Sequence, residues 1–379
     1  MAPSATTIPE PPSDKEQNGQ SNPLLPKLHP DMVDRLDADF IAYWKEFIAT
    51  KPATHGVTVA DVRANPAKYH AVWNRDLSGE DFVRDIAIKA DDGHEFTVRL
   101  YTPDAESSPY GHGPYPIYIN FHGGGWVYGD LTGDAALCLS IRNRLGIMVA
   151  DVDYRMSPEH AFGEGHDDAF AALRWIHDHG PSLNVRSDAI SIGGISAGGH
   201  ICAALQQMAR DAGIPLSLVP ATVWHGDYLQ PTDSPFPSMT TNQHAPCLDW
   251  ARLFFFRNHY VPKTAQERDV LFSKQPAIAS PLFGRGGGRA PNKSQDKEDI
   301  RHSISLANLC DTFVATAELD PLCDEGEEYA RRLAGNGVRV SMRRYTGVPH
   351  PFMHMVGVAK AQLYMDDVCG ELARACARV

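Results

Sequence analysis

The chain has no long apolar run, and acidic residues outnumber basic ones. No stretch approaches the roughly 18 apolar residues that a membrane-spanning helix needs, so we expect no membrane span. The 47 acidic and 35 basic residues give a net charge of −12, which argues against nucleic acid or an anionic membrane as a partner. The first 20 residues contain neither a basic segment nor an apolar core, so we expect no secretory signal and a cytoplasmic location.

Cysteine is sparse and scattered. The seven cysteines are odd in number, and their spacing does not match that of a metal site. This pattern favours free thiols in a reducing compartment over a disulfide framework. We expect neither a metal nor a cofactor. With 43% hydrophobic and 22% charged residues, the chain has enough apolar material for the large core of a globular protein.

Strand-like and helix-like segments alternate along most of the chain. Phe82–Ala90 and Glu95–Tyr101 alternate apolar and polar side chains on either side of Asp91-Asp92-Gly93, which predicts a β-hairpin. Further strands are predicted at Tyr115–Phe121, Gly146–Asp153, Ala189–Ile192, Leu216–Trp224, Thr312–Ala317 and Val338–Tyr345. Helices are predicted at Thr132–Leu145, Asp167–His179, Ile201–Arg210, Glu325–Gly335 and Val356–Arg378. This alternation indicates an α/β fold whose sheet is mostly parallel, with the hairpin antiparallel at one edge.

Three segments depart from this alternation. Residues 1–27 are rich in Pro, Ser, Gln and Asn, which predicts a disordered tail. From Asp31 to Ala49, apolar residues recur every three or four positions and predict one helix, whose aromatic face either packs in the core or covers a pocket. The segment 228–302 contains the aromatic stretch Leu248–Phe256 and a polar, glycine-rich loop at about 284–300 that we expect to be flexible. An aromatic insertion of this kind is typical of a cap over an active site.

The stretch Asp188–His200 predicts a strand, a tight glycine-rich turn and a helix. A Gly-x-Ser-x-Gly turn in this context is typical of a nucleophile elbow, in which the strained nucleophile is Ser196. The flanking glycines allow the strand and the helix to approach each other closely. Taken alone, the stretch is equally compatible with an ordinary strand-to-helix turn, so the choice depends on the rest of the chain.

If Ser196 is the nucleophile of a serine hydrolase, the enzyme also needs groups that donate hydrogen bonds to the oxyanion. The amide of Ala197, directly after the serine, is one expected donor, and a glycine-rich loop after an earlier strand should supply the others. The loop His122–Trp126, sequence HGGGW, directly follows the predicted strand Tyr115–Phe121. Consecutive glycines let backbone N–H groups point at one oxygen without a side chain in the way.

The catalytic acid is expected after Ser196, because in hydrolases with a nucleophile elbow the acid and then the histidine follow the nucleophile along the chain. Asp320 lies in the loop after the predicted strand Thr312–Ala317, at the edge of the sheet where α/β proteins place functional groups. Glu318 and Asp324 are alternative acids, and either could instead be solvated or cap the helix that begins nearby.

His350 is the expected base, since it lies in the loop after the predicted strand Val338–Tyr345. Three other histidines lie near predicted site segments. We expect His354 to fall outside this loop and His200 to lie on a helix that points away from the site. The His122 ring is expected to hold the glycine loop by a hydrogen bond to the backbone.

Several motifs together resemble the hormone-sensitive-lipase-type branch of the α/β-hydrolase fold, a group of carboxylesterases. The matching motifs are HGGGW at His122–Trp126, DYRMSPEHAF at Asp153–Phe162, GISAGG at Gly194–Gly199, SPLF at Ser280–Phe283, AELDPLCDEG at Ala317–Gly326 and HPF at His350–Phe352. They appear in the family order over roughly residues 80–375. The resemblance implies a hydrolase core at 81–227 and 303–379, with cap helices at 28–80 and a cap insertion at 228–302.

The resemblance also implies roles for individual residues. Ser196 is implied as nucleophile, Asp320 as acid and His350 as base, and the implied oxyanion donors are Gly124, Gly125 and Ala197. We expect Trp126 and Ile195 to contact the substrate. Ile195 stands where the family usually has an aspartate before the nucleophile, so substrate preferences of the family do not transfer directly.

The leading hypothesis is a serine carboxylesterase acting on short-chain or compact hydrophobic esters. Trp44, Phe47 and the Phe254–Phe256 cluster are the expected aromatic walls of its pocket. A lactonase or an amide hydrolase is an alternative, because the same catalytic groups serve other acyl groups. A non-catalytic small-molecule receptor on the same fold is a more distant alternative. The expected partner is therefore a small ester or lactone, and the chain is also a candidate for a homodimer.

Overall fold

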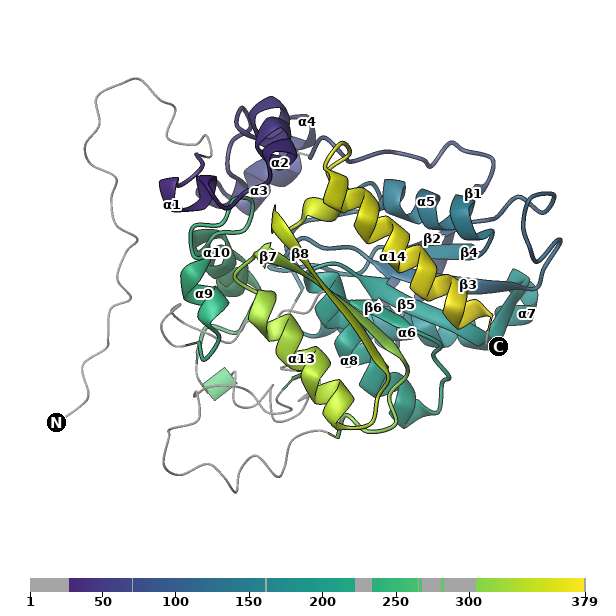
Figure 1. Cartoon of the computed structure of the whole chain (residues 1–379). Helices are drawn as coiled ribbons and strands as arrows, with labels where there is room; N and C mark the ends of the chain where they lie inside the picture. Colours follow the sequence, from purple (N-terminus) through teal and green to yellow (C-terminus); the bar gives the residue numbers. More distant parts are fainter. Residues whose placement is uncertain are drawn as a thin grey trace.

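The computed structural model describes residues 27–69, 71–160, 162–221, 234–264, 266–267, 281–282 and 305–377. Apart from Lys27, the predicted tail at 1–27 lies outside these ranges, as does the predicted loop at about 284–300. A central sheet carries helices on both faces, and short helices lie across one end (Figure 1).

Within the described residues, eight strands form one sheet in the order β1-β2-β4-β3-β5-β6-β7-β8. Their bounds are β1 Val83–Lys89, β2 Glu95–Tyr101, β3 Tyr115–Phe121, β4 Met148–Val152, β5 Val185–Gly194, β6 Val219–Ala221, β7 Thr312–Leu319 and β8 Val340–Pro349. β1 pairs antiparallel with β2, Val83 lying opposite Tyr101, and β2 pairs antiparallel with β4. The other neighbours are parallel. The predicted α/β fold with an antiparallel edge hairpin is confirmed.

Helices cover both faces of this sheet. Those of the core are α5 Ala135–Leu145, α6 Glu164–Asp178, α7 Gly180–Leu183, α8 Ala197–Ala212, α13 Cys323–Gly335 and α14 Ala359–Cys376, with the 3-10 turn η5 at Phe352–His354. α5 and α14 pack against one face, and α6, α8 and α13 against the other (Figure 1). None of the described helices has both the length and the apolar character of a membrane span.

The alternation of side chains along each strand divides the core in two. On β3, Ile117, Ile119 and Phe121 join the apolar cluster beneath α6 and α8. Tyr118, between them, joins the cluster beneath α5 and α14. Because both faces are covered, all seven residues of β3 are buried. This explains why the central strands appear in the sequence as continuous apolar runs.

The N-terminal segment forms short helices and turns, not one long helix. They are α1 Pro30–Val33, α2 Ala38–Tyr43, the π-helical turn η1 Trp44–Ile48, the 3-10 turn η2 Thr54–Gly56, α3 Val59–Ala64 and α4 Pro66–Tyr69. The prediction of a single helix from Asp31 to Ala49 is therefore wrong. The helix is interrupted before α2, where the Asp37 amide donates to the Gly347 carbonyl at 2.8 Å. A hydrogen bond to the core has replaced a bond within the helix.

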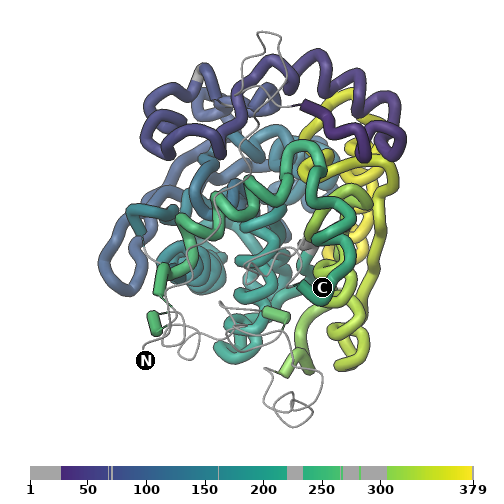
Figure 2. Tube along the Cα trace, turned by 90° about the vertical axis from the view of Figure 1, so that its left-hand side faces the viewer, coloured from purple at the N-terminus to yellow at the C-terminus, as the bar shows by residue number. Residues whose placement is uncertain are grey.

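The insertion contributes α9 Pro237–Thr241 and α10 Trp250–Tyr260. In Figure 2 the N-terminal segment, in purple, crosses one end of the molecule, and the insertion, in green, lies next to it. α10 contacts η2, and the rings of His29 and His244 stack with their centroids 4.0 Å apart. Two segments that are distant in sequence therefore form one layer over the same end of the sheet.

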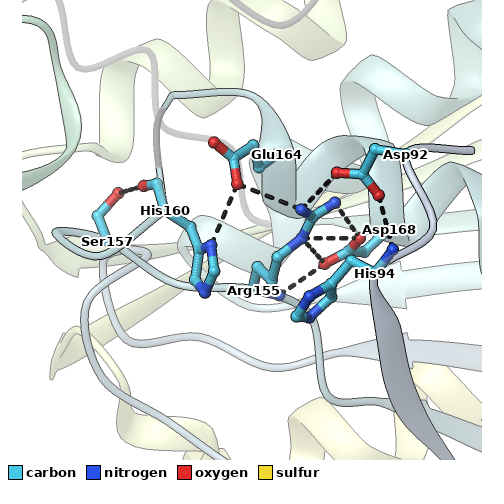
Figure 3. A network of polar contacts seen from close by, with 7 residues as sticks. All are labelled: Asp92, His94, Arg155, Ser157, His160, Glu164 and Asp168. Atoms are coloured by element: carbon cyan, nitrogen blue, oxygen red, sulfur yellow. Dashed lines mark hydrogen bonds and ion pairs between the residues drawn. The ribbon is translucent and has the colours of Figure 1, made fainter. Parts of the chain in front are cut away.

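Arg155, in the motif after β4, is the centre of a network of charged side chains (Figure 3). Its guanidinium donates to Asp168 of α6 at 2.7 Å and to Asp92 of the β1–β2 turn at 2.6 Å. It also donates to Glu164 Oε2 at 3.2 Å, and this carboxylate oxygen lies 3.1 Å from His160 Nδ1. The network joins the edge hairpin, the segment after β4 and α6.

We expect Asp168→Asn to lower the free energy of unfolding by about 3 kcal/mol, because it leaves the buried Arg155 guanidinium without its main counter-charge. The Asp168 side chain is fully buried, whereas that of Asp92 is 53% exposed. The control Asp92→Asn removes a contact from the same guanidinium and should cost less than about 1 kcal/mol. Urea-induced unfolding of the two variants checks this. Equal losses would contradict the central role of Asp168.

Candidate active site

Ser196 lies at the junction of β5 and α8. Its backbone angles, φ 59° and ψ −119°, form a conformation that residues with a side chain rarely adopt. The residue lines a pocket and is only partly buried. The strained turn therefore leaves the predicted nucleophile accessible at the carboxyl end of β5.

Close backbone contacts hold this turn against the end of β3. A Cβ atom on Gly198 would lie 1.8 Å from the Phe121 carbonyl oxygen, so only glycine fits there. On the other side of the serine, a Cβ atom on Gly123 would lie 3.6 Å from the Ser196 Cβ. The elbow and the glycine loop are thus in direct contact.

The glycine loop turns sharply at Gly124 and Gly125, whose φ angles are 119° and 62°. The Gly124 carbonyl accepts hydrogen bonds from the amides of Val127 at 3.1 Å and Tyr128 at 2.9 Å. Within the part of the chain that the structure describes, the Gly124 and Gly125 amides donate no hydrogen bond. Both glycines line the same pocket as Ser196. Two available amide donors beside a serine are suited to stabilising an oxyanion.

The side chain of His122 holds this loop. Its Nδ1 lies 2.8 Å from the Gly123 carbonyl oxygen, and its ring stacks on Tyr154 with centroids 4.4 Å apart. The Tyr154 hydroxyl donates to the His122 carbonyl at 2.8 Å. The structural role expected for His122 is confirmed, and Tyr154, in the motif after β4, shares it.

Trp126 is not among the residues that line the pocket, which disagrees with the expected substrate contact. Its buried ring stacks on Tyr260 of α10 with centroids 4.0 Å apart and meets His200 edge-on. His200 lies on α8, with its Nδ1 3.1 Å from His166 Nε2. Burial lowers the pKa of His200 to about 3, so its ring is neutral at physiological pH. This cluster packs behind the glycine loop, as expected for His200 but not for Trp126.

Asp320 and His350 meet in the interior of the protein. His350 Nδ1 lies 2.8 Å from Asp320 Oδ2, and the other carboxylate oxygen accepts a hydrogen bond from the Leu322 amide at 2.9 Å. His350 lines the pocket together with Ser196, whereas the buried Asp320 lies behind it. Because Nδ1 faces the carboxylate, Nε2 is the nitrogen available for proton transfer.

The two alternative acids have other partners. Glu318 Oε2 accepts a hydrogen bond from the Gly347 amide at 2.9 Å, in the strand that leads to His350. Asp324 Oδ2 accepts one from the Ser238 amide of α9 at 2.7 Å. Of the three candidates, Asp320 is the one whose carboxylate contacts the histidine.

The pocket beside Ser196 has a volume of about 710 Å³. Of the expected aromatic walls, Trp44 and Phe47 line it from the N-terminal segment and Phe256 from α10. Ile195 also lines it, next to the serine. Among the described residues, no three His, Cys, Asp or Glu side chains are grouped as metal ligands would be.

Two polar residues of this pocket were missed by the sequence analysis. His354 and Asp134 both line it, and His354 Nε2 lies 3.4 Å from Asp134 Oδ1. Asn120 Nδ2 donates to the other Asp134 oxygen at 3.0 Å. Burial lowers the pKa of His354, although the Asp134 charge opposes this shift. His354 lies outside the loop that carries His350, as expected, but the turn η5 places it at the pocket, which the sequence did not indicate.

Arg63 of α3 is a third residue without a sequence signal. Its Nη2 donates to the Val127 carbonyl at 3.0 Å and to the Ser157 carbonyl at 2.8 Å, and Nη1 pairs with Glu159. Arg63 also lines the pocket. One guanidinium therefore joins the N-terminal segment to the residue directly after the glycine loop and to the motif after β4.

Comparison with known proteins identifies the family of this chain. The sequence profile of a family with the α/β-hydrolase fold matches residues 118–354. The chain is 34% identical over 251 residues to Esterase LipI of Mycobacterium tuberculosis, covering 65% of this chain and 68% of that protein. It is 30% identical over 315 residues to Carboxylesterase NlhH of the same organism, covering 83% and 88%.

A solved structure also matches this chain. The hyperthermophilic esterase from the archaeon Pyrobaculum calidifontis matches with a TM-score of 0.68 at 27% identity, over 84% of this chain and 94% of that one. The region matched by the family profile runs from β3 to η5 and contains Ser196, Asp320 and His350. The chain therefore belongs to the hormone-sensitive-lipase-type branch of the α/β-hydrolase family and is a carboxylic ester hydrolase.

Proposed function

We propose that the protein hydrolyses esters through an acyl-enzyme on Ser196, with His350 as general base and Asp320 as the acid that orients it. The observation that carries this proposal is the 2.8 Å contact between His350 Nδ1 and Asp320 Oδ2, beside a pocket that Ser196 also lines. A buried carboxylate on Nδ1 selects the tautomer whose Nε2 accepts a proton, and it stabilises the imidazolium that then forms.

The reaction follows from these positions. Ser196 Oγ forms a bond to the ester carbonyl carbon while His350 Nε2 takes the hydroxyl proton. The tetrahedral intermediate then expels the alcohol, which leaves with the proton from His350. A water molecule gives its proton to His350 as its oxygen attacks the acyl carbon. Release of the carboxylic acid returns the proton to Ser196 Oγ.

Gly124, Gly125 and Ala197 are the proposed donors to the oxyanion. Their amides belong to two turns in contact with each other, so the donors are already in place before charge develops. A single such donor typically contributes about 10²- to 10³-fold to kcat. Ala197 also begins α8, whose N-terminal dipole favours negative charge at this point.

We further propose that residues 28–80 and 228–302 form a cap that restricts the substrate to short-chain or compact hydrophobic esters. Trp44, Phe47 and Phe256 supply aromatic walls to the pocket. Ile195 adds an apolar side chain next to the nucleophile. Walls of this kind favour compact apolar groups, because such groups lose little on leaving water.

Lactones and amides are a second class of substrate, since the same groups serve any acyl transfer. A binding protein without catalysis would be expected to lack a member of the triad. Ser196, Asp320 and His350 are all present in this chain, which favours an enzyme.

A fluorophosphonate should label the protein once, on Ser196, because this reagent reacts with an activated serine hydroxyl. Ser196→Ala should abolish labelling. The control Ser182→Ala changes an exposed serine that bonds only its own turn, and it should leave labelling intact. Mass spectrometry of the intact protein gives the stoichiometry. A wild-type protein that stays unlabelled would contradict the proposed acyl-enzyme.

Asp320→Asn should lower kcat by about 10⁴-fold, because the amide cannot hold the imidazole in the required tautomer. Glu318→Gln should keep most of the activity, since the glutamine oxygen can still accept the hydrogen bond from Gly347. Steady-state kinetics with 4-nitrophenyl acetate compares the two variants. The reverse order of activities would show that the acid is Glu318.

The cap predicts a preference for small acyl groups. Across 4-nitrophenyl acetate, butyrate and decanoate, kcat/KM should fall at least about tenfold from butyrate to decanoate. Phe47→Ala should narrow this difference by enlarging the pocket at one wall. Rates with a matched lactone and an anilide, measured under the same conditions, show whether the protein hydrolyses the second class of substrate. Equal rates for all three esters would rule out restriction by the cap.

A further inference from the structure

Helix α9 packs against the loop that carries the proposed acid. We call residues 318–324, which run from the last residues of β7 to the first residues of α13, the acid loop. α9 and the residue that follows it, Asn242, are not among the residues that line the pocket. They lie beside the start of α13 (Figure 1). The proposed mechanism assigns no function to the contact between α9 and the acid loop.

Asn242 is the centre of this contact, and its side chain is buried. Its Nδ2 donates to two carbonyl groups of the acid loop, that of Glu318 at 2.8 Å and that of Asp320 at 3.0 Å. Its Oδ1 accepts a hydrogen bond from Arg35 Nη2 at 2.7 Å. Arg35 belongs to the N-terminal segment, so one amide joins both parts of the proposed cap to the acid loop.

The partners of Asn242 allow its amide only one orientation. A guanidinium can only donate hydrogen bonds, so the oxygen must face Arg35. A backbone carbonyl can only accept, so the nitrogen must face Glu318 and Asp320. Rotation of the amide by half a turn would break all three hydrogen bonds. Arg35 and the two carbonyl groups together fix which end of the Asn242 amide faces the acid loop.

Ser238, one turn earlier in α9, holds the other end of the acid loop. Its hydroxyl donates to the Pro321 carbonyl at 2.8 Å and accepts from the Asp324 amide at 3.1 Å. The Asp324 carboxylate in turn accepts a hydrogen bond from the Ser238 amide at 2.7 Å. Together with Asn242, these bonds hold the loop on both sides of the carboxylate.

These contacts constrain the backbone of Asp320, while others orient its carboxylate. Its carbonyl oxygen accepts from Asn242 and from the Cys323 amide at 3.1 Å. The Leu322 amide holds Oδ1 at 2.9 Å, which leaves Oδ2 for His350. Displacement of the loop would therefore move the carboxylate relative to the imidazole.

We propose that Asn242 is a positioning residue for Asp320, and that Arg35 positions Asn242 in turn. The inference rests on the proposed role of Asp320 as the catalytic acid. It assigns the insertion a second function besides covering the pocket, because α9 holds the acid loop in place relative to His350. A misplacement of about 1 Å in a catalytic group can cost 10²-fold in rate, so the contribution is large enough to measure.

The first variant is Asn242→Asp, which keeps the shape of the side chain and an acceptor for Arg35. It replaces the donor nitrogen with an oxygen that repels the Glu318 and Asp320 carbonyls. We expect kcat for 4-nitrophenyl acetate to fall between about 10- and 100-fold. KM should change less than about twofold, because Asn242 does not contact the pocket.

Asn336→Asp is the matched control. Asn336 follows the other end of α13, is exposed, and donates its Nδ2 to the Arg332 carbonyl at 2.8 Å. The same substitution there removes the same kind of hydrogen bond far from the acid loop. It should leave kcat at the wild-type value.

A spectroscopic readout separates positioning from a loss of stability. The His350 Nδ1 proton, shared with Asp320, should give a strongly downfield proton NMR signal in the wild-type protein. We expect the signal to be lost or shifted in Asn242→Asp and retained in Asn336→Asp. A role confined to stability would lower the melting temperature while leaving both the signal and kcat unchanged below it.

Two milder variants keep the test decisive if Asn242→Asp does not fold. Arg35→Met leaves the amide of Asn242 without its orienting donor, and Ser238→Ala removes the two bonds of the Ser238 hydroxyl. Each should lower kcat several-fold at unchanged KM. If the folded variants all retain wild-type kcat while Asp320→Asn is inactive, the positioning role is wrong and the proposed triad stands. If Asp320→Asn is active, the proposed function itself fails.

Discussion

The carbonyl group of Phe121, at the end of β3, lies so close to the start of α8 that a Cβ atom on Gly198 would come within 1.8 Å of it. This approach sets the distance between β3 and the elbow, and it brings the loop that follows β3 into contact with Ser196. The unfavourable φ of 59° at Ser196 belongs to the same constraint, because tightly packed backbone on both sides keeps the serine in that conformation. The proposed nucleophile Ser196 and the proposed donors Gly124 and Gly125 line one pocket for this reason.

Arginine side chains make many of the connections around this centre. Arg155 joins the edge hairpin to α6. Arg63 joins the N-terminal segment to Val127, directly after the glycine loop, and Arg35 joins the same segment to Asn242. A guanidinium presents several donors in a fixed plane, so one side chain can satisfy carbonyl and carboxylate oxygens from separate segments. The parts of the proposed cap are thus held to the core by directional hydrogen bonds as well as by apolar packing.

Sequence patterns succeeded where the determining interactions are local. The strands were found because both faces of the sheet are covered. The elbow was found because its strand, glycines, serine and helix form one contiguous motif, although the close contact that requires Gly198 is made with Phe121 of β3. Sequence patterns failed where a contact with a residue distant in sequence determined the local structure. The Asp37 amide bonds to Gly347 and interrupts a helix that the apolar periodicity predicted. Trp126 is the last residue of the glycine loop, yet its ring stacks on Tyr260 of a helix distant in sequence and does not line the pocket.

The sequence by itself determined the fold class, the turn that carries Ser196 and the loops that carry Asp320 and His350, because the order of strands, helices and glycines encodes each of them locally. Only the tertiary structure decided which of three acids meets His350, and that His354 and Asp134 reach the pocket. It also decided that Asn242 lies between Arg35 and the acid loop. These pairings join residues far apart in the chain. Neither the periodicity of a segment nor a motif contains information on the spatial distance between such residues.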